Sequence, residues 1–151
     1  MQTYLTSSLV AVVLAGAAGS CIPDDAGCNV DDDCGAGLCA NTHECLDPGS
    51  LMRVELRWTI GGVAVNPNDA TACTDAAIER LSVTFRDDDS AEGLATTYDP
   101  VPCNLGRMVY TRMPTWFDSL TLVGWSDDGV LANDSGSLAG PETILDLDLV
   151  P

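Results

Sequence analysis

The sequence predicts an all-β domain that follows a short, loop-rich segment held by disulfide bonds. Apolar and polar residues alternate over most of residues 51–151, which is the period of a half-buried strand. Turn-forming Gly, Pro, Asn and Asp separate these stretches at regular intervals. Four cysteines lie between positions 28 and 45, in a stretch with few apolar side chains. Together these features predict a β-sandwich preceded by a disulfide-stapled segment.

Composition limits the possible functions. The chain has 151 residues, with 23 acidic against 6 basic side chains and a net charge of −17. All six basic residues are arginines, and they are scattered along the sequence. This length fits one small domain with an appendage. A nucleic-acid or anionic-membrane binder needs a basic face, so we expect no nucleic-acid partner.

Residues 1–20 have the features of a secretory signal peptide. They contain no charged side chain, and an apolar run from Leu9 to Gly19 ends in small residues. That run is shorter than the about 20 apolar residues that a membrane span needs. Its length and its small-residue end match a cleavable export signal. We therefore expect a secreted protein that begins after residue 20.

The signal ends in Ala18-Gly19-Ser20-Cys21, which resembles the lipobox of bacterial lipoproteins. The resemblance implies that Cys21 is acylated and becomes the new N-terminus. In that family the next residue directs sorting, and Ile22 in place of Asp implies retention in the outer membrane. The expected location is the cell envelope, with the protein anchored in the outer membrane by its lipid.

Cysteine parity gives independent support for acylation. The chain has seven cysteines, an odd number that needs explanation in an exported protein. If Cys21 carries lipid, six remain and can pair completely. The alternative is ordinary signal cleavage, which would leave Cys21 free or paired with a second chain.

Residues 21–50 form an acidic, Cys-rich segment and linker. The segment has seven acidic residues, no basic residue and too few apolar side chains for a core of its own. Two disulfides are expected among Cys28, Cys34, Cys39 and Cys45, with all three connectivities open. Residues 47–50 have turn chemistry and mark the boundary. The segment resembles the small Cys-rich modules of bacterial surface lipoproteins, which implies a spacer or interaction role.

Two kinds of metal site are conceivable in this segment. Zinc binding by Cys34, Cys39 and His43, with Cys28 or Cys45 as a fourth ligand, conflicts with the expected oxidising location. His43 is more simply a surface residue. Asn29, Asp31 and Asp33 alternate as in an EF-hand, but the required later glycine and glutamate are missing. Calcium binding of another kind stays open. We expect no resident metal and no cofactor.

Residues 51–151 contain the strand-like stretches. Alternation is clearest at 51–60, 78–86, 120–123 and 144–150, and Asp128-Gly129 suggests a tight hairpin. A single helical turn beginning at Thr74 is the one rival pattern. Cys73 and Cys103 are expected to form a disulfide at strand ends or between loops. The expected inward-facing side chains are Leu56, Trp58, Leu81, Val83, Leu122 and Leu147.

A further resemblance covers about twenty residues. Residues 112–114, the aromatic pair that follows, and residues 119–131 are similar to part of the transthyretin-like and carboxypeptidase-regulatory-like β-sandwiches. Bacterial surface lipoproteins often contain such domains. The resemblance implies an Ig-like or transthyretin-like sandwich, but it fixes no function because many functions share these folds.

No catalytic motif is present in the sequence. Its single histidine, His43, falls in the Cys-rich segment, and every cysteine has a structural explanation. We therefore expect a non-enzymatic binding or structural module of the envelope. Its candidate binding surface is formed by Trp116, Phe117 and Trp125, which could contact an envelope protein. A carbohydrate-binding module and a calcium-dependent adhesion module are the alternatives.

Overall fold

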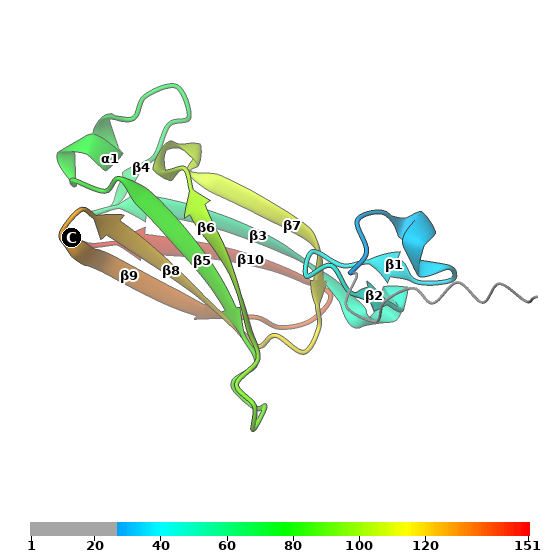
Figure 1. Ribbon diagram of the computed structural model, residues 1–151. Helices are drawn as coiled ribbons and strands as arrows, with labels where there is room; N and C mark the ends of the chain where they lie inside the picture. Colours follow the sequence, from blue (N-terminus) through cyan, green and yellow to red (C-terminus); the bar gives the residue numbers. More distant parts are fainter. Residues whose placement is uncertain (1–26) are drawn as a thin grey trace, which may run out of the picture.

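A computed structural model describes residues 27–151 of the chain, so the expectations for the signal peptide and Cys21 lie outside the described residues. Two sheets dominate the described part (Figure 1). In the first sheet, β3 (Leu51–Ile60) pairs with β10 (Glu142–Leu149), β7 (Arg107–Pro114) and the short β4 (Val63–Ala64). The second sheet has the order β6 (Ala95–Val101), β5 (Arg80–Arg86), β8 (Ser119–Ser126) and β9 (Gly129–Ser137).

β3 is the central strand of the first sheet. It runs parallel to β10 and antiparallel to β7, with a register shift between Met52 and Val54. Val54, Leu56, Trp58 and Ile60 point into the protein and are buried, as alternation predicts. The indole N–H of Trp58 is also satisfied, because it donates to the Cys103 carbonyl at 3.0 Å.

The two sheets share one hydrophobic core. All six side chains that the sequence predicts to face inward are buried in it, which confirms the strand assignments. Phe85 lies at its centre with no exposed surface. Its ring packs edge-on against Tyr110, with centroids 4.9 Å apart, and also contacts Tyr98 and Phe117. The mostly β fold with disulfide bonds is therefore confirmed.

The connections show one confirmed prediction and one correction. A two-residue loop joins β8 and β9, with Ser126 opposite Gly129, so the predicted hairpin is present. The helix α1 spans Thr71–Asp75, so Thr74 lies inside it and does not cap its start. The Asp69 carboxylate instead accepts the Thr71 backbone N–H at 2.9 Å, which favours an earlier start.

The third disulfide joins Cys73 in α1 to Cys103 in the short helix η3 (Cys103–Leu105). Both sulfurs are buried at one end of the core. The bond therefore connects two segments outside the strands, as the sequence predicts.

The Cys-rich segment is built from very short elements. It contains the single-turn helices η1 (Asp31–Cys34) and η2 (Pro48–Ser50) and a minimal hairpin of β1 (Leu38–Cys39) and β2 (Cys45–Leu46). Cys28 pairs with Cys39 and Cys34 with Cys45, one of the three connectivities open from sequence. The two disulfide loops overlap along the chain, which ties the segment together.

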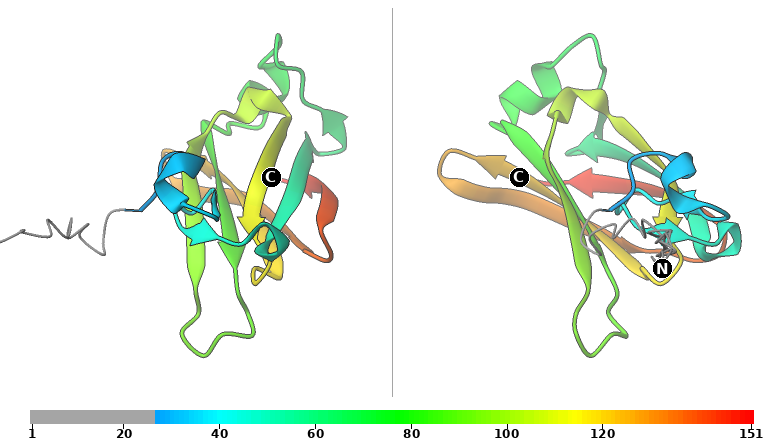
Figure 2. Two further views of the ribbon diagram at one scale, coloured as in Figure 1. Left: turned by 90° about the vertical axis from the view of Figure 1, so that its right-hand side faces the viewer. Right: turned by 45° about the vertical axis from the view of Figure 1, so that its right-hand side comes forward.

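The Cys-rich segment lies against β7 (Figure 2). Asn41 mimics a neighbouring strand: its backbone N–H donates to the Arg112 carbonyl at 2.9 Å, and its side-chain oxygen accepts the Arg112 N–H at 2.8 Å. Its own carbonyl accepts the Tyr98 hydroxyl of β6 at 3.0 Å. Asn41 thereby connects the segment to one strand of each sheet.

Candidate binding surface

The three aromatic residues predicted to form a binding surface do not lie together. Phe117 is only 5% exposed and packs in the core, so its assignment to the surface is wrong. It turns inward because the chain bends after Pro114, whose carbonyl accepts the Phe117 N–H. Trp116 and Trp125 are half-buried; Trp116 precedes β8, and Trp125 is the next-to-last residue of that strand. The two residues are only nine positions apart in the sequence, but the extended strand between them holds their side chains far from each other.

Trp125 is already engaged by its surroundings. Its indole N–H donates to the Ser82 hydroxyl at 2.9 Å. The Arg80 guanidinium lies over its ring, 4.9 Å from the centroid, in a cation–π contact. One face of this indole is therefore covered by the protein itself.

The structure brings together arginines that are scattered in the sequence. Arg53 and Arg57 are on the outward face of β3, and Arg107 of β7 lies directly opposite Arg57. All three guanidinium groups bond to the carboxylate of Glu55, which stands between Arg53 and Arg57 on the same strand. Alternation alone places Arg53, Glu55 and Arg57 on one face, but only strand pairing adds Arg107.

Glu55 is almost fully covered by these arginines, with 5% of its side chain exposed. Its oxygens lie 2.7 Å from Arg57 Nη2, 3.0 Å from Arg53 Nη2 and 3.0 Å from Arg107 Nε. Hydrogen bonds from Arg57, then those from Arg53 and Arg107, lower the pKa of Glu55 to about 2 against the opposing effect of burial. The carboxylate is thus charged and organises the three cations. We call these four residues the arginine–glutamate cluster.

Exposed aliphatic side chains border the cluster on both sides. Ile144 of β10 and Val109 of β7 are the cross-strand neighbours of Glu55, and they are 50% and 37% exposed. Glu142 binds Arg53 at 2.6 Å, and Asp146 is the cross-strand neighbour of Arg57. The outward face of the first sheet therefore combines fixed charges of both signs with two apolar side chains.

A cavity of about 350 Å³ opens next to the cluster. Its lining combines charged side chains with apolar ones, among them Arg57, Arg107, Asp146, Asp148, Ala64 and Val65. This size falls in the range of sites that take a small molecule or a partner's side chain.

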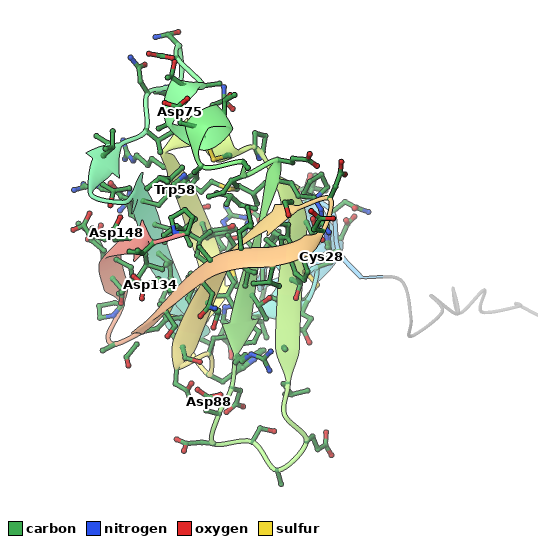
Figure 3. The ribbon with its side chains drawn as sticks, turned by 90° about the vertical axis from the view of Figure 1, so that its left-hand side faces the viewer. Cys28, Trp58, Asp75, Asp88, Asp134 and Asp148 are labelled. Atoms are coloured by element: carbon green, nitrogen blue, oxygen red, sulfur yellow. A yellow bond between two sulfur atoms is a disulfide. The ribbon has the colours of Figure 1, made fainter. Side chains whose placement is uncertain are left out.

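Carboxylates of β9 and β10 are held at the margin of this face. Asp134 accepts the Asp148 backbone N–H at 2.9 Å, and both side chains lie where the two strands meet (Figure 3). Asp148 in turn accepts the Thr59 hydroxyl and the Gly62 N–H, at 2.7 and 2.9 Å. These bonds lower the pKa of Asp148, the one from Gly62 most strongly.

The cysteine sulfurs of the Cys-rich segment cannot bind zinc in this structure. The Cys28, Cys34 and Cys45 sulfurs lie within 4.8 Å of one another, but each belongs to a disulfide and offers no thiolate. His43 is exposed, and its Nδ1 is 2.9 Å from the Cys28 carbonyl oxygen.

The acidic residues that are candidates for calcium binding bond to the protein itself. Asp33 accepts the backbone N–H groups of Asn29 and Val30, at 2.9 and 3.2 Å, which lowers its pKa. Asp31 accepts the Cys39 N–H at 3.0 Å and pairs with Arg112, and these bonds lower its pKa. Their oxygens therefore stabilise the fold of the segment and its contact with β7.

Comparisons with protein-family models, with curated proteins and with solved structures find no match for this chain. Within residues 27–151, no helix has the length and apolar character needed to cross a membrane. The function is therefore inferred from the residues and their geometry.

Proposed function

We propose that this chain is an exported envelope lipoprotein, anchored in the outer membrane through Cys21, whose β domain is a non-enzymatic binding or structural module. Cysteine pairing is the observation that supports the anchor most directly. All six cysteines from Cys28 onward are joined in three disulfides, so Cys21 is the single cysteine left over. It is also the residue at the lipobox position. A diacyl or triacyl group supplies the multiple chains that stable anchoring requires.

The proposed contact surface is the arginine–glutamate cluster with Ile144 and Val109. Arginines preorganised by a buried carboxylate lose little freedom when they bind a partner's acidic groups. The adjacent aliphatic side chains add apolar area that association would bury. The partner we propose is an envelope protein, which would lie flat on the outer face of the first sheet.

The Ig-like or transthyretin-like identity of the sandwich is also a proposal. Two sheets with a common core and the hairpin at residues 126–129 support it. No observation favours either alternative, a carbohydrate-binding module or a calcium-dependent adhesion module. A carbohydrate platform would need aromatic rings side by side, whereas Trp116 and Trp125 are separated by the length of β8. Asp31 and Asp33 are engaged within the protein.

Intact-mass measurement tests the anchor. The full chain is expressed in a Gram-negative host, extracted from membranes with detergent, and weighed before and after reduction and thiol alkylation. We expect the mass of residues 21–151 plus a diacyl or triacyl group, with six alkylations that appear only after reduction. An unacylated product that starts near residue 20 would overturn the proposal.

The contact surface is tested separately by photocrosslinking in the envelope. A photoreactive residue replaces Ile144, or replaces Val130 of β9, which is exposed to a similar degree and serves as the matched control. We expect a specific adduct with an envelope protein from position 144 alone, and we expect R57E together with R107E to abolish it. Equal amounts of adduct from positions 144 and 130 would contradict the proposed contact surface.

A further inference from the structure

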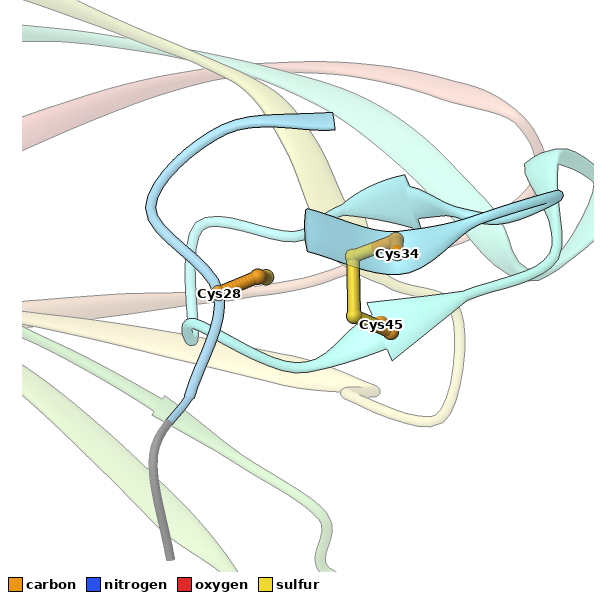
Figure 4. Close-up of side chains that lie close together, drawn as sticks. All are labelled: Cys28, Cys34 and Cys45. Carbon is orange, nitrogen blue, oxygen red and sulfur yellow. A yellow bond between two sulfur atoms is a disulfide. The ribbon is translucent and has the colours of Figure 1, made fainter. Parts of the chain in front are cut away.

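The two disulfides of the Cys-rich segment lie close to each other. The sulfurs of Cys34 and Cys45, which are bonded together, are both within 4.8 Å of the Cys28 sulfur (Figure 4). Cys28 is itself bonded to Cys39. A thiolate released from one disulfide would therefore already be near the other, without unfolding of the segment.

The two bonds differ in their exposure to solvent. Cys45 is exposed and Cys34 is half-buried, whereas Cys28 and Cys39 are both buried. Thiol–disulfide exchange needs access for the attacking thiolate, so a small thiol would react first at Cys45. The buried Cys73–Cys103 bond, at the far end of the domain, offers an internal comparison.

The strand register adds a second close pair. Cys39 and Cys45 stand directly opposite each other in the β1–β2 hairpin. Residues in such positions have Cβ atoms roughly 4.5–5.5 Å apart. A disulfide needs a Cβ separation of about 3.5–4.5 Å, so a small adjustment would allow Cys39 and Cys45 to bond.

We propose that the Cys-rich segment is a thiol-triggered disulfide switch with two pairings. In the described state Cys28 pairs with Cys39 and Cys34 with Cys45. In the second state Cys28 pairs with Cys34 and Cys39 with Cys45. The inference does not depend on the lipid anchor or on the proposed contact surface.

The interconversion proceeds in three balanced steps. A small thiolate attacks the Cys45 sulfur, forms a mixed disulfide there and releases Cys34 as a thiolate. Cys34 then attacks the Cys28 sulfur, which forms the new bond between them and releases Cys39 as a thiolate. Cys39 attacks the Cys45 sulfur, closes the second new bond and expels the small thiolate. Two disulfides are present before and after, so the thiol is a catalyst and no net oxidation occurs.

The switch would change how the segment is held on β7. The overlapping loops of the described pairing become two separate loops, one after the other along the chain. Asp31, which pairs with Arg112, falls in the first loop, and Asn41 falls in the second. No disulfide then links the loop that contains Asp31 to the loop that contains Asn41. The two contacts with β7 form independently, and the segment docks less tightly.

The test uses the full chain and glutathione. The protein is incubated at neutral pH with a low concentration of reduced glutathione, quenched in acid, alkylated and digested without reduction. Proteases that cut before aspartate, before leucine and after glutamate separate the four cysteines. They cleave at Asp31, Asp32 or Asp33, then at Leu38, and finally at Glu44. We expect peptides linked through 28–34 and 39–45 to form and to level off at a constant fraction beside the original pairs, because a catalyst sets the rate of exchange and not its equilibrium. No lasting gain of free thiols is expected.

A matched variant isolates the proposed path. With both C28S and C39S, the first step still occurs, but Cys34 has no second disulfide to attack. This variant should stop at the mixed disulfide or return to the 34–45 bond. In the natural chain, mixed disulfide without any new internal link would overturn the proposal. Exchange of Cys73–Cys103 at the same rate would also overturn it, because general unfolding would then explain the reaction.

Discussion

The Cys-rich segment and the β domain are stabilised by different means. In the domain, buried apolar side chains from both sheets form one continuous core. In the described part of the segment, the buried apolar positions are Cys28, Cys39 and Ala40, and none of them belongs to that core. Two disulfides and local hydrogen bonds therefore replace hydrophobic burial there. The difference shows how one short chain can add a folded appendage that has almost no core.

Reduction of every disulfide should reveal the largest difference in stability between the two regions. Each disulfide is worth about 2–4 kcal/mol of unfolding free energy, and the segment has little else to hold it. We expect residues 28–46 to lose all protection from hydrogen exchange, while β3, β5 and β8 keep theirs. Hydrogen-exchange mass spectrometry with and without a reductant measures this. Persistent protection of the reduced segment would contradict the comparison.

Removal of the central aromatic side chain should destabilise the β domain and leave the disulfides of the Cys-rich segment intact. Phe85 is fully buried, and F85A should cost about 3–5 kcal/mol of unfolding free energy by leaving a cavity. Denaturant unfolding of the domain measures this loss. The Cys28–Cys39 and Cys34–Cys45 links should survive, as mapped by non-reducing digestion. A cost below about 1 kcal/mol would mean that the core does not depend on this residue.

A substitution at the junction between the two regions should have a smaller effect on stability than the loss of the disulfides or of Phe85. N41A removes the side-chain oxygen that accepts the Arg112 N–H, a bond worth about 1 kcal/mol. We expect faster exchange of the amides at residues 39–46 and little change in the sheets. N133A, at an exposed position of β9, is the matched control. Equal effects of the two variants would show that Asn41 does not fasten the segment.

Acid titration of Glu55 tests the ionic contribution of the arginine–glutamate cluster to the stability of the β domain. Its pKa is about 2 in the folded protein, below the usual value of about 4.3 in an unfolded chain. Its charged form therefore stabilises the fold above about pH 4.3, and this contribution is lost as pH falls from there towards 2. The melting temperature of E55Q should be lower than that of the natural protein at pH 7, and the gap should narrow in acid. A gap that does not depend on pH would contradict the ionic role.

The sequence predicted local features well and long-range placement poorly. Alternation identified Leu56 and Trp58 as core residues, because the strand period decides which side chains face inward. It could not pair Arg57 with Arg107, since that contact depends on how distant strands register. The assignment of Phe117 to the surface is wrong because the chain bends after Pro114, and this bend turns the ring into the core.

Cysteine pairing shows the same limit. The number of disulfides followed from parity and expected export, but the connectivity of the Cys-rich segment did not. It depends on how the β1–β2 hairpin folds against η1, and this hairpin has only two residues in each strand. Strands of two residues are too short to show an alternation of apolar and polar residues in the sequence.

Fatty-acid labelling tests the central claim most directly. The full chain is expressed in a Gram-negative host fed with an alkyne-tagged fatty acid, beside C21S and, as a matched cysteine control, C45S. We predict that the natural chain and C45S carry the label in the outer-membrane fraction, and that C21S carries none. An unlabelled natural chain, or a labelled C21S, would contradict the anchor at Cys21.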